Sequence, residues 1–146
     1  DYALIKVAET GTAKSLSWRL KNHTIAGKTG TSNDLRDSWF AGYDNKHLVT
    51  TWLGKDNNKP TGLTGSSGAL VLFADFIKKR GVENKKNTKP EAISLTLFEK
   101  KTGHAVTSKC DNTVNYPAIS AGIVIQKSCL KEKVDDKSWF EKLFSD

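Results

Sequence analysis

Residues 26–32, with the sequence Ala-Gly-Lys-Thr-Gly-Thr-Ser, combine one cation, three hydroxyl side chains and two glycines. The residues before this segment favour an extended backbone, whereas Asn33 and Asp34 favour a turn after it. A glycine within a strand often marks a place where a ligand or a second backbone comes close. The Lys28 ammonium and the neighbouring hydroxyls therefore indicate a strand edge that binds an anion, with another chain lying alongside Gly30.

Other residues with reactive side chains form weaker patterns. A Ser-x-x-Lys segment, Ser128 to Lys131, lies far after Lys28 and contains a cysteine, so we do not expect it to hold a nucleophile. The three histidines lack a Ser or Asp pattern around them and are expected to be surface or strand residues, namely His23, His47 and His104. We expect no metal and no cofactor.

The two cysteines, Cys110 and Cys129, are too far apart for a redox Cys-x-x-Cys motif and have no further ligands nearby for zinc. A single disulfide in an oxidising compartment is the favoured interpretation, and two buried free thiols are the alternative.

The composition of the 146-residue chain fits a soluble core, and its net charge of +7 favours anionic partners. The lysines are scattered, and no nucleic-acid-binding motif is present, so we expect no nucleic acid partner. No apolar run reaches the ~18 residues of a membrane span, and no signal peptide is visible. The chain has no methionine and opens within an apparent amphipathic helix, so we expect it to be a piece of a longer protein.

Elements around the Lys28 strand follow from periodicity and turn signals. Helices are predicted at 1–10, 13–20 and 68–80, and a β-hairpin at 37–43 and 47–54. Thr12 is the expected N-cap of the second helix, Thr64 or Ser66 that of the third, and Gly81 its stop. Apolar residues on both faces of 37–43 predict a strand covered twice. The pattern predicts an α+β fold with an antiparallel sheet covered by helices.

The lysine-rich segment from Val82 to Lys89 is interpreted as the start of a boundary between two domains, 1–81 and 82–146. The second is predicted to be a small β-containing appendage. Its expected strands are 93–98 and 121–125, the second of them between the cysteines. A final amphipathic helix, capped by Asp135 or Asp136, is expected to carry Trp139, Phe140, Leu143 and Phe144.

Lys-Thr-Gly is one of three signatures of the serine acyl-transferases that include β-lactamases and penicillin-binding proteins. Four segments of the chain resemble, in order and spacing, the transpeptidase domain of class A penicillin-binding proteins, and they span residues 11–16, 26–32, 37–43 and 52–56. The likeness covers 1–81 well and reaches the cysteine pair and the terminal residues more weakly. It implies the C-terminal half of the serine β-lactamase/D,D-transpeptidase fold.

The resemblance implies roles for the four residues of the Lys28 strand. Lys28 would assist proton movement and attract the substrate carboxylate, and the hydroxyls of Thr29 and Thr31 would bind that carboxylate. The Thr31 N–H would also donate to the oxyanion, and Gly30 would leave room for the peptide. The family's Ser-x-x-Lys nucleophile and its Ser-x-Asn motif do not precede Lys28 here, so the chain holds half of a site.

The function that the resemblance implies is part of a D,D-transpeptidase that crosslinks peptidoglycan stem peptides and reacts with β-lactams. The parent would be a bifunctional glycosyltransferase and transpeptidase, anchored in the bacterial inner membrane with this region in the periplasm, and it could have partner proteins in cell-wall synthesis. Two alternatives are a non-catalytic periplasmic module that binds a cell-wall anion and a fragment of a serine β-lactamase or carboxypeptidase. A Ser-x-x-Lys followed by Ser-x-Asn upstream of Asp1 would decide between them.

Overall fold

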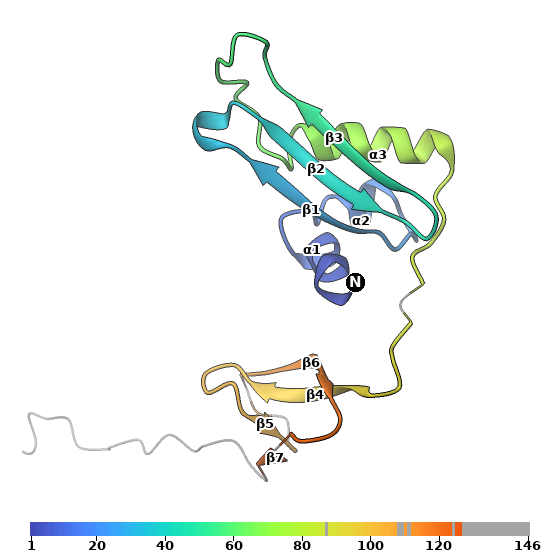
Figure 1. Cartoon of the computed structure of the whole chain (residues 1–146), viewed down its shortest axis with the longest axis vertical. Coiled ribbons are helices and arrows are strands. Elements are labelled where there is room, and N and C mark those ends of the chain that lie inside the picture. Colours follow the sequence, from blue (N-terminus) through green and yellow to red (C-terminus); the bar gives the residue numbers. More distant parts are fainter. Residues whose placement is uncertain (87, 108–109, 111, 124, 127–146) are drawn as a thin grey trace, which may run out of the picture. The chain divides into compact units, whose positions relative to one another are not determined.

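The computed structural model describes residues 1–86, 88–107, 110, 112–123 and 125–126. Two compact units divide the chain, Asp1–Thr88 and Lys89–Asp146 (Figure 1). The predicted boundary between residues 81 and 82 lies earlier than this division. The difference arises because Val82 packs against the core of the first unit and Lys85 donates a backbone hydrogen bond to Thr24.

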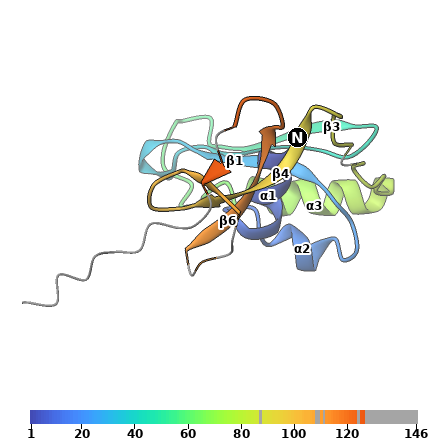
Figure 2. The ribbon, with the colours of Figure 1, turned by 90° about the horizontal axis from the view of Figure 1, so that it is seen from below.

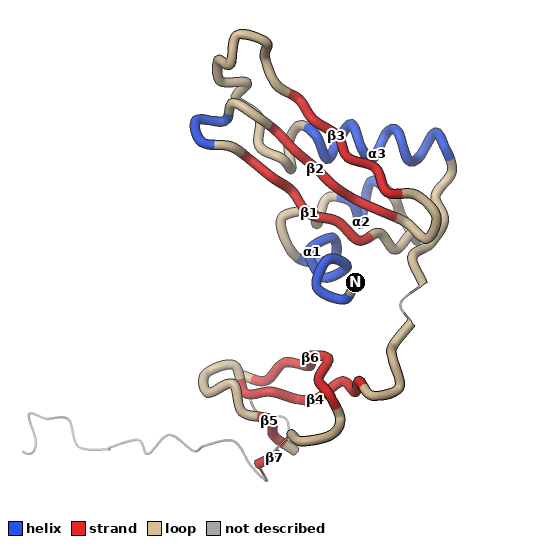
Figure 3. Tube along the Cα trace, viewed as in Figure 1, coloured by secondary structure: helices blue, strands red, loops and turns tan. Residues whose placement is uncertain are grey.

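The first unit consists of one antiparallel sheet and helices that cover it. Its elements are α1 (Tyr2–Thr10), α2 (Leu16–Arg19), β1 (Ala26–Thr31), the 3₁₀ turn η1 (Asn33–Leu35), β2 (Ser38–Tyr43), β3 (Leu48–Leu53) and α3 (Ala69–Arg80). The strands form a three-stranded sheet in the order β1-β2-β3 (Figure 3). This architecture confirms the predicted α+β class, and the hairpin and α3 lie at the predicted positions.

The core of the first unit lies between the sheet and its helices. Figure 2 shows β1 and β3 on one side, with α2 and α3 on the other. Phe40 of β2 is fully buried, and its ring centroid lies 4.8 Å from that of Phe73 in α3. The buried side chains around this pair come from the helices, from the turn between α1 and α2 and from the segment before β1, and they are Ala8, Ala13, Leu16, Leu20, Ile25, Ala69, Leu70, Ala74 and Ile77.

Within the first unit, no described helix or strand covers the second face of the sheet. Trp39 is 45% exposed and Trp52 is 44% exposed, and their ring centroids lie 6.0 Å apart. The prediction that strand 37–43 is covered on both faces is therefore wrong for the described residues. Alternation explains the difference, because only Ser38, Phe40 and Gly42 of β2 point toward the helices.

Helix starts in the first unit differ from the predicted caps. The second helix is only α2, and its N-cap position is Ser15, so the N-cap prediction for Thr12 is wrong. The first amide of α3, that of Ala69, donates to the buried hydroxyl of Ser38 at 2.8 Å, and neither Thr64 nor Ser66 takes this role. Ser38 also donates to the Thr64 carbonyl at 2.8 Å, so one hydroxyl of β2 fixes the start of α3.

The second unit is a four-stranded sheet in the order β6-β4-β5-β7. Its strands are β4 (Ile93–Glu99), β5 (Ala105–Val106), β6 (Thr113–Ile119) and β7 (Ile125–Gln126). The predicted strand 93–98 is confirmed as β4. Of the strand predicted at 121–125, residues 121–123 form no strand and Ile125 begins β7, whereas β6, the long partner of β4, was not predicted. Pro117 obscures β6 in the sequence, and a sheet edge tolerates a proline because no further strand needs its missing N–H.

Three predictions fall on residues outside those described. They are the terminal helix after Asp135 and Asp136, the Ser128 to Lys131 segment, and Cys129. Cys110 is disulfide-bonded in the structure, and its pairing with Cys129 stays a prediction. Among the described residues, no helix has the length and apolar character needed to cross a membrane.

Candidate functional site

The Lys28 strand is β1, and it forms one edge of the first sheet. Lys28 lies opposite Ala41, and Gly30 lies opposite Trp39, so both belong to the second face of the sheet. The Lys28 side chain is exposed, and its ammonium donates to the Thr29 carbonyl at 2.7 Å. This cation is thus held beside the strand edge and remains accessible from solvent.

The hydroxyls of Thr29 and Thr31 point toward the opposite face, as the two-residue period of a strand requires. The Thr29 Oγ1 lies 2.7 Å from the Oγ1 of Thr12, which belongs to the turn between α1 and α2. The Thr31 Oγ1 accepts a hydrogen bond of 2.9 Å from the backbone N–H of Gly65, in the loop before α3. Two separate loops therefore contact the two hydroxyls.

The backbone of β1 offers its N–H groups to the outer edge at alternate residues. The backbone N–H of Ser32 donates to the Asp37 carbonyl at 3.1 Å and so points toward β2. This bond continues the register in which Thr31 pairs with Ser38. In an antiparallel ladder, successive residues direct their backbone groups to opposite sides. The N–H groups of Thr29 and Thr31 consequently point away from β2, where they can bind a ligand or an added strand.

Close backbone packing explains the glycines around β1. A Cβ at Gly30 would lie 3.1 Å from the Trp39 Cβ, so a larger residue there would press on β2. A Cβ at Gly65 would lie 2.6 Å from the carbonyl oxygens of Gly30 and Trp39. The loop before α3 therefore lies directly against β1 and β2, which is what brings the Gly65 N–H to Thr31.

The structure brings the four predicted site residues, Lys28, Thr29, Gly30 and Thr31, together on one edge strand. Sequence reasoning missed two contacts of this strand, Thr12 and Gly65. Thr12 lies within residues 11–16, one of the segments that carry the family resemblance, and this position could have indicated that it contacts the site. Gly65 carries no local signal, because its role comes from the close approach of the loop to β1 and β2.

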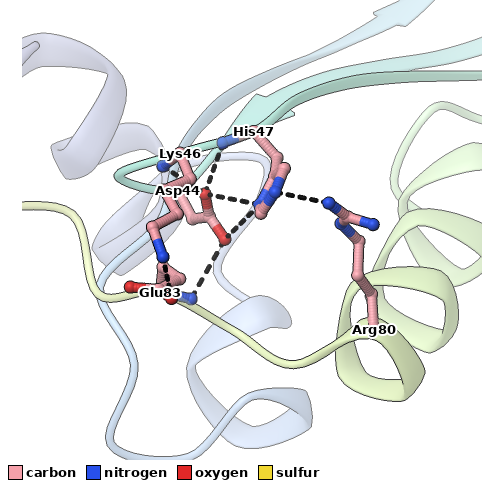
Figure 4. A network of polar contacts seen from close by, with 5 residues as sticks. All are labelled: Asp44, Lys46, His47, Arg80 and Glu83. Carbon is pink, nitrogen blue, oxygen red and sulfur yellow. Dashed lines mark hydrogen bonds and ion pairs between the residues drawn. The ribbon is translucent and has the colours of Figure 1, made fainter.

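A second polar cluster lies at the other end of the hairpin and surrounds the buried carboxylate of Asp44 (Figure 4). Asp44 accepts backbone hydrogen bonds from Lys46 at 2.8 Å, His47 at 2.7 Å and Glu83 at 3.0 Å. The His47 ring lies between Asp44 and Arg80. Burial by itself would raise the pKa of Asp44, but these donors together lower it to about 2. The cluster ties the hairpin to the chain after α3, which is a structural role.

Comparison with known proteins places these observations in a family, although no family model matches the chain. Penicillin-binding protein 1B of Vibrio cholerae is 38% identical over 143 residues, covering 98% of this chain. Penicillin-binding protein 1B of Haemophilus influenzae is 42% identical over 92 residues, covering 63% of this chain. The chain spans only 18% and 12% of the lengths of these two relatives.

The solved structure of penicillin-binding protein 1A from Haemophilus influenzae matches the fold with a TM-score of 0.65 at 24% identity. The match covers 88% of this chain and 20% of the chain of penicillin-binding protein 1A. The antiparallel sheet with its helices is thus the fold of a penicillin-binding transpeptidase domain. Together with the sequence relatives of types 1B and 1A, this identifies the chain as a member of the class A penicillin-binding protein family, corresponding to its C-terminal region.

Proposed function

We propose that this chain supplies the substrate-binding strand of a serine D,D-transpeptidase that crosslinks the stem peptides of peptidoglycan. The nucleophilic serine belongs to a part of the longer protein outside these residues. The geometry of β1 supports the proposal, because an ammonium on one face, two hydroxyls on the other and two outward N–H groups lie along the same edge strand of the first sheet.

Each group has a distinct role in this proposal. The carboxylate of a stem peptide is attracted by the Lys28 ammonium and accepts hydrogen bonds from the hydroxyls of Thr29 and Thr31. The peptide lies as an extended strand along β1, next to Gly30, and pairs with its outward backbone groups. The Thr31 N–H stabilises the oxyanion that forms when the serine attacks the carbonyl, a contribution of about 3 kcal/mol at comparable sites.

The same groups would bind a β-lactam, which carries a carboxylate beside a strained amide. The longer protein is proposed to be anchored in the bacterial inner membrane, with this region on the periplasmic side, and to carry a glycosyltransferase domain. Other proteins of cell-wall synthesis are its proposed partners. Crosslinking requires the serine, so the chain described here binds substrate without completing the reaction.

The test replaces Lys28 in the longer protein and measures acylation by a fluorescent penicillin. Lys28→Ala should lower the acylation rate at least about tenfold, because a charge contact to the substrate is lost. Lys55 is a matched control, since its ammonium also donates to a backbone carbonyl, that of Pro60. The fluorescent penicillin should acylate Lys55→Ala at the wild-type rate. A Lys28→Ala rate within about twofold of wild type would contradict the proposal.

The thermal melting temperature separates a loss of function from a loss of folding. Lys28 is exposed, and substitutions at such positions usually change stability by no more than about 0.5 kcal/mol. Lys28→Ala should therefore have the melting temperature of the wild type, although penicillin acylates it slowly.

A further inference from the structure

We propose that Thr12 is a positioning residue for the substrate carboxylate, acting through the hydroxyl of Thr29. This inference rests on the proposed function of β1. Thr12 lies in the turn between α1 and α2, 17 residues before its partner, and its Oγ1 is 2.7 Å from the Thr29 Oγ1. That is the usual length of a hydroxyl-to-hydroxyl hydrogen bond.

Thr12 has no role in helix capping that would account for its position. The N-cap of α2 is Ser15, and no side-chain hydrogen bond caps that helix. The Thr12 side chain is exposed, so burial does not explain it either. Its hydrogen bond with Thr29 links the side chains of the α1–α2 turn and of β1.

The direction of the Thr12 to Thr29 hydrogen bond determines what Thr29 can offer to a ligand. Two hydroxyls share one bond, so one of them donates and the other keeps its own proton free. When Thr12 donates, the Thr29 proton is free to bind an anion at the strand edge. When Thr29 donates, its proton is used within the protein and is lost to the ligand.

Thr31 shows the same arrangement with a fixed direction. Its Oγ1 accepts from the Gly65 N–H at 2.9 Å, and a backbone N–H can only donate. The Thr31 proton is therefore free for a ligand. If Thr12 donates to Thr29, both threonines present a free proton, and a carboxylate has two oxygens to accept them. A bound anion favours this direction, because each hydrogen bond in such a chain polarises the next.

The test uses the longer protein and two ligands that differ only in the carboxylate, benzylpenicillin and its methyl ester. Thr12→Val keeps the shape and removes the hydroxyl. It should lower acylation by benzylpenicillin about fivefold, because Thr29 keeps its own hydroxyl and loses only the neutral hydrogen bond that orients and polarises it. Acylation by the ester should change less than about twofold. Thr12→Ser keeps the hydroxyl and should restore the benzylpenicillin rate.

Thr10 supplies a matched control from the end of α1. Its exposed hydroxyl donates to the Lys6 carbonyl at 3.1 Å, within α1 itself. Thr10→Val also loses one hydroxyl hydrogen bond, and both ligands should acylate it at the wild-type rate.

The outcomes separate this inference from the proposed function. A wild-type protein that neither ligand acylates would overturn both. Suppose the wild type is acylated, but Thr12→Val reacts with benzylpenicillin at the wild-type rate, or reacts equally more slowly with both ligands. The proposed role of Thr12 is then wrong, and the proposed function of β1 stands. Thr12→Ala is a second variant without the hydroxyl and should behave like Thr12→Val. Unfolding of both variants would show that the hydroxyl is structural and would also overturn the inference.

Discussion

The buried carboxylate of Asp44 accepts a 3.0 Å hydrogen bond from the backbone N–H of Glu83, and this bond joins the β2–β3 hairpin to the segment after α3. The Asn45 N–H donates in return to the Glu83 carbonyl at 2.9 Å. Lys46 adds an ion pair of 2.8 Å to the Glu83 carboxylate at the surface. The chain after α3 is thereby held against the end of the sheet opposite the 3₁₀ turn η1.

Asp44→Asn should lower the stability of the first unit and flatten its acid dependence. The folded pKa of Asp44, about 2, lies below the ordinary 3.8, so its charge contributes about 2 kcal/mol above pH 4. That contribution is lost as the pH falls from about 4 through 2. Urea unfolding between pH 2 and 7 measures it. Asp56→Asn, in an exposed loop, is the control and should leave the curve unchanged. An equally steep acid loss in Asp44→Asn would contradict this assignment.

Gly65→Ala should destabilise the first unit and disturb the site strand, because the added methyl group would meet the Gly30 and Trp39 carbonyls at 2.6 Å. Overpacking against backbone typically costs 1–3 kcal/mol, so about 2 kcal/mol is expected. Gly62→Ala is the matched control, since Gly62 has a φ of 76° but open space around it. It should cost only about 1 kcal/mol. Chemical unfolding measures the loss of unfolding free energy in both variants. A smaller loss in Gly65→Ala than in Gly62→Ala would show that the loop before α3 moves aside freely.

This chain alone should form no covalent adduct with a fluorescent penicillin, because the acyl-accepting serine is expected outside it. Denaturing electrophoresis after incubation is the measurement. A labelled band would contradict the expectation, and its loss in Ser128→Ala would assign the nucleophile to the Ser128 to Lys131 segment.

Cys110 and Cys129 should be joined when the protein is exported to an oxidising compartment, which thiol counting under denaturing, non-reducing conditions measures. A crosslink that closes a loop of this size stabilises by roughly 3 kcal/mol. Reduction should therefore speed hydrogen exchange in β4 and β6 and leave β1, the hairpin and α3 unchanged. Two free thiols would refute the disulfide. Equal loosening of β1 would show that the two units do not unfold independently.

Local patterns in the sequence predicted the elements whose stability depends on their own residues. The β2–β3 hairpin follows from aromatic and β-branched residues on either side of Asp44, Asn45 and Lys46. The end of α3 follows from Gly81, whose φ of 94° suits a glycine after Arg80. β6 was missed because Pro117 argues against a strand unless the strand is known to lie at an edge, which depends on the topology of the whole sheet.

The candidate site strand could be predicted from local sequence, since Lys28, Thr29, Gly30 and Thr31 are consecutive and their side chains indicate which groups they can bind. The sequence also determined the family, because four short segments kept their order and spacing. The groups that contact that strand could be identified only from the folded arrangement. Thr12 and Gly65 reach it through a turn and a loop that lie next to β1 only after α1 and α3 pack on the sheet. Contacts between distant segments depend on this packing, and no local pattern records it.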